Sequence, residues 1–399
     1  MVQMQTLARV LASLLLVVPE MSWTQPRDVS GVVFLDANGN GIRDRGEPGL
    51  GNVTISNQDA VVATDASGTY RLPRKADGVL FVSVPDGHRA VGAFWRPMDE
   101  TTTTVDFPLA RVAASAEFTF IHASDTHIST AVLARMERFR SLADSLDPAF
   151  VLITGDLVKD ALRVGEPEAT GYYELFGREV ARFKNPVWTV PGNHENFGIE
   201  RTQSHVTADH PLYGRKMYHH YRGPDYYSFT FGGVHFVGLN TVDIDDQWYY
   251  GHVDSVQLAW LARDLATVPP EMPVVTFDHI PFFSSAEPMS GYTENPPAPT
   301  LITVNGKTMF RHTVSNAAAV LTVLRQRRHV LALGGHNHRS EQTVFDVEGV
   351  QTRFNQTAAI VGSGASGGMQ FVSGFTLYTV RGGVIDAGRF IPLGIDAKK

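Results

Sequence analysis

The chain has no cysteine among its 399 residues. Disulfides, thiolate metal sites and a cysteine nucleophile are therefore excluded, and any bound metal must take imidazole, carboxylate or amide ligands. Charged residues make up 19% of the chain and the formal net charge is −7, so the composition offers no basic surface for nucleic acid or an anionic membrane. The apolar fraction of 43% is ordinary for a globular protein, and the length predicts two or three domains.

Long apolar runs are also scarce. The run at residues 10–18 follows Arg9, lies at the extreme N-terminus and is too short to span a bilayer. We predict a signal peptide over residues 1–24, with cleavage after Thr24 and export to the periplasm or the medium. The alternative is a buried first helix. No other segment is long and apolar enough to cross a membrane, so no span is expected in the mature chain.

Residues 25–112 have the pattern of a small all-β domain. No helical period of useful length occurs there, and Gly, Asp, Asn and Pro separate short β-rich runs. These runs are residues 32–35, 53–56, 68–72 and 79–84. We predict a small β-sandwich, with residues 111–117 joining it to the rest of the chain.

One loop of this domain matches the twelve-residue calcium pattern D-x-[DN]-x-[DN]-G-x₅-E in full. Its oxygen donors are Asp36, Asn38, Asn40, Asp44 and Glu47. A strand precedes the loop and Pro-Gly follows it, so the two helices of an EF-hand are not expected. The region resembles the SdrD B-like calcium-binding repeat of bacterial surface proteins, which implies a calcium site. The alternative is an acidic, Asn/Gly-rich hairpin turn that binds no ion.

From residue 118 to the C-terminus at residue 399, strands alternate with helices, which predicts a layered α/β domain. The expected strands are residues 118–121, 150–154, 186–190, 234–239, 274–277 and 330–333, and the expected helices are 131–146, 174–183, 255–265 and 316–327. The tail at 342–393 is again β-rich. Residues 196–226 and 281–311 have little regular pattern, and loops of this length are usually functional or mobile.

Polar side chains follow five of the expected strands. The segments are Asp125-Thr-His127, Gly155-Asp156, Gly192-Asn193-His194-Glu195, Asp278-His279 and Gly334-Gly-His336-Asn-His338. Sites in open α/β sheets form beyond the carboxyl ends of strands, so we expect these side chains to surround one crevice. Their carboxylate, amide and imidazole groups are enough for two cations that share a carboxylate.

In this order, the five segments resemble the signature D-x-H, GD, GNH[DE], H and GHxH of the calcineurin-like metallophosphoesterase superfamily. The resemblance covers residue 118 to the C-terminus and implies a four-layer α/β/β/α sandwich of two mixed sheets flanked by helices. Purple acid phosphatases have a tyrosine in the GD segment and no D-x-H histidine. Here Leu157 follows Asp156 and His127 is present, so the sequence resembles the non-purple branch.

The resemblance also implies a role for each residue. Asp125, His127 and His338 would hold one metal, Asn193, His279 and His336 a second, and Asp156 would bridge both. His194 would be catalytic rather than a ligand, and would hydrogen-bond the phosphate or protonate the leaving alkoxide. The expected cofactors are two ions chosen from Mn, Fe, Zn and Ni, because these suit nitrogen and oxygen donors without sulfur.

The expected function is that of an exported binuclear-metal phosphoesterase. It would hydrolyse phosphodiester or phosphomonoester bonds of a small substrate through a metal-bridging hydroxide. Nucleic acid is not expected as a partner because of the acidic charge balance. The alternative is a cell-surface binding protein with a degenerate phosphoesterase domain. The sequence leaves the substrate and the oligomeric state open.

A few residues near these segments have two interpretations each. Asp278 is a partner of a metal-binding histidine or has no such role, and Asp160 orients a site histidine or faces solvent. His205 and His219-His220 contact substrate or lie on the surface. Trp248, Tyr249 and Tyr250 form a wall of the substrate site or belong to the core. His122, His235 and His329 are expected to be packing residues.

Overall fold

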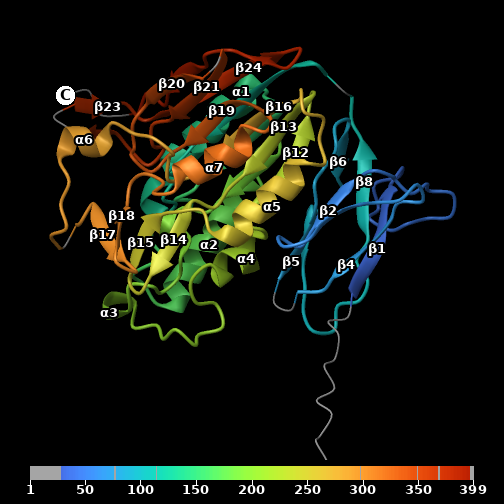
Figure 1. Cartoon of the computed structure of the whole chain (residues 1–399), viewed down its shortest axis with the longest axis horizontal. Coiled ribbons are helices and arrows are strands. Elements are labelled where there is room, and N and C mark those ends of the chain that lie inside the picture. The colour runs from blue at the N-terminus through green and yellow to red at the C-terminus, as the bar shows by residue number, and fades with distance from the viewer. Residues whose placement is uncertain are drawn as a thin grey trace, which may run out of the picture.

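The computed structural model describes residues 28–395 except 76–77, 114, 297, 348 and 367–368. The predicted signal peptide, residues 1–24, lies outside the described residues. Within the described part, no helix is long and apolar enough to cross a membrane. Figure 1 shows an all-β region beside a larger domain of sheets and helices.

The N-terminal region is all-β, as predicted, and consists of two four-stranded sheets of order β4-β1-β8-β6 and β3-β2-β5-β7. The strands are β1 (Asp28–Leu35), β2 (Thr54–Ser56), β3 (Val61–Ala63), β4 (Thr69–Pro73), β5 (Val79–Val82), β6 (His88–Ala90), β7 (Trp95–Pro97) and β8 (Phe107–Arg111). Alternate residues of a strand point to the same face, and Val29 and Val33 of β1 are both fully buried. They share a core with Ile55 and Leu80 of the other sheet.

The larger domain is built on two six-stranded sheets, of order β11-β10-β9-β24-β25 with β26 beside β24, and β12-β13-β16-β19-β21-β20. The first contains β9 (Glu117–Ala123), β10 (Phe150–Thr154), β11 (Val187–Val190), β24 (Gly374–Arg381), β25 (Val384–Ile385) and β26 (Arg389–Pro392). The second contains β12 (Tyr227–Phe231), β13 (Val234–Gly238), β16 (Pro273–Phe277), β19 (Arg328–Gly334), β20 (Glu341–Val347) and β21 (Val350–Gln356).

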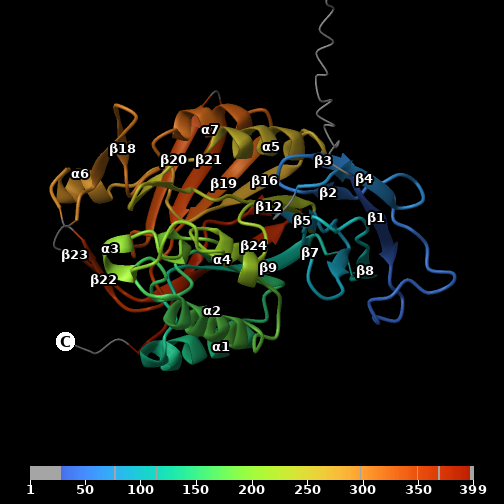
Figure 2. The same ribbon diagram turned by 90° about the horizontal axis from the view of Figure 1, so that it is seen from below.

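Helices cover the outer faces of both sheets, with α1 (Leu133–Leu146) and α2 (Glu166–Val180) on the first and α5 (Ser255–Leu265) and α7 (Ala317–Leu324) on the second (Figure 2). Phe139 and Phe176 pack with Ile153 on the first sheet. Aromatic rings fill the space between the sheets, where Phe120 stacks on Phe150 at 5.5 Å. The four-layer sandwich implied by the sequence is therefore confirmed.

Shorter elements lie in the two segments without regular sequence pattern and in the tail. They are α3 (Arg201–Ser204), α4 (Lys216–Arg222), α6 (Ala286–Ser290), β17 (Leu301–Val304), β18 (Lys307–Phe310), β22 (Gly364–Ser366) and β23 (Met369–Phe371). Between them in the chain, β14 (Val242–Asp245) and β15 (Trp248–Gly251) form a hairpin. Single 3₁₀ turns occur at Thr130–Val132 and Asn193–Glu195.

The β-region packs against strand β12, which is the edge of the second sheet. Ser83 and Ser228 share a hydrogen bond of 2.8 Å, and the backbone amide of Thr230 donates to the carbonyl of Val84 at 2.9 Å. The indole of Trp260 donates to the hydroxyl of Ser56 at 3.1 Å. An uncovered edge strand is a site for unwanted pairing, so this contact protects the edge of the second sheet.

Candidate metal centre

The predicted site residues all follow the carboxyl end of a strand, in the first sheet after β9, β10 and β11 and in the second after β16 and β19. Within each set these strands run parallel, so their carboxyl ends lie at one edge. The structure brings together at this edge Asp125, His127, Asp156, Asn193, His194, His279, His336 and His338. They form overlapping clusters rather than one ring of donors.

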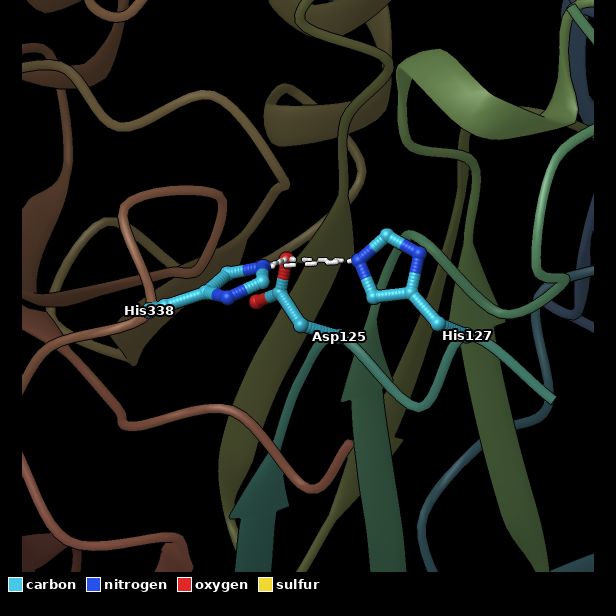
Figure 3. Close-up of side chains that lie close together, drawn as sticks. All are labelled: Asp125, His127 and His338. Atoms are coloured by element: carbon cyan, nitrogen blue, oxygen red, sulfur yellow. Dashed lines mark hydrogen bonds and ion pairs between the residues drawn. The ribbon is translucent and has the colours of Figure 1, made fainter. Parts of the chain in front are cut away.

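The first cluster consists of Asp125, His127 and His338 (Figure 3). His338 Nε2 lies 3.2 Å from Asp125 Oδ1 and 3.4 Å from His127 Nε2. Asp125 is fully buried, and its Oδ1 has no hydrogen-bond partner among the described residues. A buried carboxylate oxygen without a donor is costly, and a cation between these three groups would satisfy it.

The second cluster is centred on His279 Nε2. This atom lies 3.3 Å from Asp156 Oδ1, 3.2 Å from Asn193 Oδ1 and 3.1 Å from His336 Nδ1. His279 Nδ1 donates to the carbonyl of Thr154 at 2.8 Å. That bond uses Nδ1 and directs Nε2 toward the other donors of the cluster, which is the usual arrangement of a metal-binding histidine.

Asp156 lies between the two clusters. Its Oδ2 is 3.5 Å from His127 Nε2 in the first cluster, and its Oδ1 is 3.3 Å from His279 Nε2 in the second. The backbone amide of His194 donates to Oδ1 at 3.0 Å and holds the carboxylate in this orientation. Asp156 thus has the position that a carboxylate shared by two cations requires.

Five of the predicted ligands adopt a left-handed backbone conformation. The φ angles are 54° at Asp125, 39° at His127, 46° at Asp156, 70° at His336 and 53° at His338. Non-glycine residues rarely adopt positive φ, and such strain persists where the surrounding structure enforces it. Because this strain is concentrated at the two clusters, we infer that the tight turns after the strands direct these side chains toward one another.

Burial and charge act together on the ionisation of the second cluster. Burial lowers the pKa of His279, but the carboxylate of Asp156 outweighs this effect and the pKa is raised to about 10. Burial would raise the pKa of Asp156, and the charge of His279 holds it well below its usual value instead. A cation bound here must displace the proton of His279, so its affinity falls as the pH decreases.

Glu195 ties two of the ligand segments together, a role that the sequence did not reveal. It is fully buried, and its carboxylate accepts the backbone amides of Leu157 at 2.8 Å, Val158 at 3.0 Å and Gly192 at 2.5 Å. Burial, followed by the charge of Asp156, raises the pKa of Glu195 to about 8. The acidic position of the GNH[DE] segment therefore fixes the loop that holds Asp156.

His312 is a second site residue that sequence analysis missed. Its Nδ1 lies 2.6 Å from His336 Nε2, while His336 Nδ1 faces His279. Burial lowers the pKa of His312 to about 4, so its ring is neutral, and its Nδ1 can accept from His336 when Nε2 of His336 carries the proton. No motif marks His312, which lies between the segment 281–311 and helix α7. Its only sequence signal is a histidine beside a long loop.

The structure favours one interpretation for several of the residues that the sequence left ambiguous. Asp160 Oδ1 lies 3.7 Å from His194 Nδ1, within ion-pair distance but without a hydrogen bond, so Asp160 lies beside the site histidine rather than facing solvent alone. Thr154 rather than Asp278 accepts from His279, and the buried Asp278 carboxylate has no hydrogen-bond partner among the described residues. His235 pairs with Asp264 at 2.9 Å, as expected of a packing residue.

His122 and His329 are also buried packing residues, and each is hydrogen-bonded to a threonine, Thr154 at 3.0 Å and Thr276 at 3.1 Å. His219 pairs with Asp225 at 2.9 Å, and His205 is exposed. Neither residue lines the cavity over the clusters.

A cavity of about 420 Å³ opens over both clusters. His127, Asp156, Asn193, His194, His336 and His338 line it, together with His312, Tyr249 and Glu287. Its size is that of a small-molecule site, and its donors converge from several strand ends. Tyr249 thus belongs to the wall of the site.

The chain was compared with a family model, with curated proteins and with solved structures. Residues 118–340 match the family model of the calcineurin-like phosphoesterases. No match was found among curated proteins. A dimetal phosphatase from Danio rerio is 16% identical, with 68% of this chain and 96% of that chain covered and a TM-score of 0.44. GAP50, the anchor in the inner membrane complex of Plasmodium, is 13% identical, with coverages of 70% and 86% and a TM-score of 0.42.

A third solved structure, a protein of Thermus thermophilus, is 9% identical, with coverages of 69% and 99% and a TM-score of 0.37. The family model spans 223 residues, from 118 to 340, which is more than half of the 399. The five strand-end segments all lie within that span. The chain belongs to the calcineurin-like phosphoesterase family.

Proposed function

We propose that this chain is an exported two-metal hydrolase of small phosphodiesters or phosphomonoesters. The main support is the sharing of Asp156 between two clusters of nitrogen and oxygen donors. The buried Asp125 Oδ1, which has no hydrogen-bond partner among the described residues, and the imidazole nitrogens that face one another at 3.1 Å and 3.4 Å also support cation binding. Mn, Fe, Zn and Ni suit this donor set.

The protein side chains have distinct tasks in this proposal. When bound, a pair of cations neutralises phosphoryl charge and makes a coordinated water acidic enough to attack at neutral pH. Asp125, His127 and His338 would hold one ion, and the cluster around His279 would hold the other. Asp156 would contact both ions. The imidazoles and the Asn193 amide are neutral donors, so they limit negative charge where an anionic ester must bind.

His194 is proposed to act on the ester itself. It lines the cavity, its Nε2 is 3.9 Å from Asp156 Oδ2, and its ring is 4.6 Å from that of His127. Asp160 lies beside its Nδ1 and is itself held by Arg163 at 2.9 Å. A histidine in this position can donate a proton to the departing alkoxide.

Replacing His194 with alanine is expected to leave the metal content unchanged and to lower kcat by about 10²–10⁴-fold. The measurements are metal analysis of the purified protein and steady-state hydrolysis of bis-p-nitrophenyl phosphate. His205→Ala is the matched control, because His205 is exposed and lies outside the cavity. Turnover of His194→Ala equal to that of the control would exclude the proton-donor role.

The proposed reaction class is tested by a panel of p-nitrophenyl phosphate, bis-p-nitrophenyl phosphate and cyclic nucleotides. The full chain is loaded in turn with Mn, Fe, Zn and Ni. Turnover of at least one substrate, abolished by chelation, is the expected result. Metal binding without any turnover would favour the alternative of a binding protein with a degenerate phosphoesterase domain.

Export is proposed from the sequence alone, on the short apolar run at residues 10–18 after Arg9. The test is expression of the full chain in a Gram-negative host, followed by osmotic-shock fractionation and intact mass of the product. A periplasmic or secreted product that has lost about 24 residues is expected. A cytoplasmic product of full mass would leave the buried-helix alternative standing.

Calcium is proposed for the loop of the N-terminal region. Asp44 Oδ2 accepts the side-chain amides of Asn38 at 2.8 Å and Asn40 at 2.9 Å. Asp36 accepts the backbone amides of Gly39 and Gly41 at 2.6 Å and 2.7 Å. Four of the five predicted donors, Asp36, Asn38, Asn40 and Asp44, thus lie around one turn. The fifth, Glu47, accepts the backbone amide of Asp44 at 2.9 Å.

Millimolar calcium is therefore expected to raise the melting temperature. Extracellular-type sites bind at about 10⁻⁴–10⁻³ M, and at ten times Kd the stabilisation is about 1.4 kcal/mol. Calorimetry and thermal melts of the full chain measure it, with magnesium as the ion control. Asp44→Asn should remove the gain. No heat and no shift in the wild type would support the hairpin-turn alternative.

A further inference from the structure

A second cavity adjoins the cavity over the metal clusters. It has a volume of about 550 Å³, and Tyr249 and His312 line both cavities. Trp248, Arg311, Gln203 and Gln247 line only the second one. A phosphoester with its phosphorus at the clusters can therefore extend its organic group past Tyr249 into this space.

The wall of the second cavity is held rigidly before any ligand binds. Arg311 is 5% exposed, and its guanidinium donates to the carbonyls of Tyr249 at 3.1 Å and Pro299 at 2.8 Å. The guanidinium carbon lies over the ring of Tyr249 at 4.1 Å and over that of Trp248 at 5.0 Å. Trp248 follows the hairpin turn of β14 and β15 and remains partly exposed. An indole fixed on one face and open to a cavity is a stacking surface.

The remaining groups in the wall are polar but not strongly anionic. The carboxylate of Glu200 is engaged bidentately by Arg163, at 2.9 Å and 2.6 Å. Among the described residues, no carboxylate lies within ion-pair distance of Arg311, so its charge is not neutralised by a neighbouring acid. The side-chain amides of Gln203 and Gln247 offer both donors and acceptors. This wall suits a planar ring with a hydrogen-bonding edge better than an alkyl chain or a cation.

We propose that this chain takes phosphoesters whose organic group carries a planar, polar-edged ring, such as a nucleoside, and that Trp248 stacks on that ring in the second cavity. This proposal rests on the proposed phosphoesterase function and specifies its substrate class. Stacking of a nucleobase on an aromatic side chain is tolerant of base identity, so the preference is for the ring and not for one base.

The kinetic test compares two diesters that release the same p-nitrophenol, thymidine 5′-(p-nitrophenyl phosphate) and methyl p-nitrophenyl phosphate. The metal-loaded full chain should cleave the thymidine ester with a kcat/KM at least about fivefold higher, mainly through KM. Trp248→Ala should remove this preference, because the thymidine ester should lose more kcat/KM than the methyl ester. Trp248→Phe should retain most of it, because a phenyl ring still stacks.

A binding test does not depend on turnover. Titration of the metal-free chain with thymidine 5′-phosphate should quench tryptophan fluorescence, and Trp248→Phe should lose the quenching. Equal kcat/KM for the two esters in the wild type, or equal losses for both in Trp248→Ala, would overturn the ring preference while the phosphoesterase function stands. Failure to cleave either ester with any metal, together with absence of quenching, would overturn both.

Discussion

Replacing Asp156 with alanine is expected to abolish metal binding and phosphoesterase activity together. Its two carboxylate oxygens lie 3.5 Å from His127 Nε2 and 3.3 Å from His279 Nε2, so one side chain serves both clusters. Cations stabilise the charge of a phosphoryl transition state by several kcal/mol, and each 1.36 kcal/mol is tenfold in rate. A loss of at least about 10³-fold in kcat/KM is therefore expected.

Asp147→Ala is the matched control for this substitution. Asp147 is also an aspartate in the left-handed conformation, with φ of 49° against 46° at Asp156, but its side chain is 62% exposed and pairs with Lys184 at the surface. The control should retain its metal and its activity. The measurements are metal ions per chain, steady-state kinetics and thermal unfolding. Two ions per chain in Asp156→Ala, with more than a tenth of the activity, would exclude Asp156 as the shared ligand.

Thermal unfolding separates loss of metal from loss of fold. Removing the Asp156 carboxylate leaves His279 without the charge that raises its pKa, so the buried ring becomes neutral and need not destabilise the metal-free chain. The metal-free Asp156→Ala variant is thus expected to unfold cooperatively. Added Mn or Zn should raise the melting temperature of the wild type and of Asp147→Ala, but not of this variant.

The position of the site could be predicted because it depends on local rules. Each ligand segment follows a short apolar run, and the carboxyl ends of neighbouring parallel strands lie at one edge of a sheet. The order of the segments then resembled one family, whose model matches residues 118–340. Neither step required knowledge of any contact between residues distant in the sequence.

The pairing of strands that are distant in the chain could not be predicted from the sequence. Strand β24, near the C-terminus, lies antiparallel to β9 in the first sheet, with Thr376 opposite His122 and Tyr378 opposite Phe120. The pattern of the tail indicates only that strands occur, because a strand's partner is chosen by packing against residues far away in the chain. The return of the chain to the first sheet therefore emerged only from the structure.

The supporting residues of the site were also hidden, for a related reason. His312 contacts His336 through a pairing that no fixed spacing encodes, and for Asp160 the sequence left open whether it orients a site histidine or faces solvent. The helices nearby are short, such as the five residues of α6, and helices of this length are stabilised by tertiary packing rather than by intrinsic propensity. The segment from 281 to 311 thus had no period from which to predict its structure.

Gly192 is the second position at which a single change should have a large effect. A Cβ built on it would lie 2.2 Å from Asp156 Oδ1, 2.3 Å from the Asp156 backbone nitrogen and 2.9 Å from His279 Nε2. The conflict is steric, because the φ of −102° is accessible to any residue. Alanine here must move either the shared carboxylate or the loop that carries Asn193. Overpacking of this kind costs about 1–3 kcal/mol in stability.

Gly192→Ala is therefore expected to bind metal more weakly and to lose at least about 10²-fold in kcat/KM, since small misplacements of reacting groups cost this much. Gly171→Ala is the control, because Gly171 lies in helix α2 and its Cβ would meet no atom within 4 Å. That change should leave activity intact and stabilise the helix by about 0.5–1 kcal/mol. Metal titration, kinetics and thermal unfolding of both variants provide the comparison. Wild-type affinity and rate in Gly192→Ala would mean that the close approach of this loop to Asp156 is not needed to hold the two clusters together.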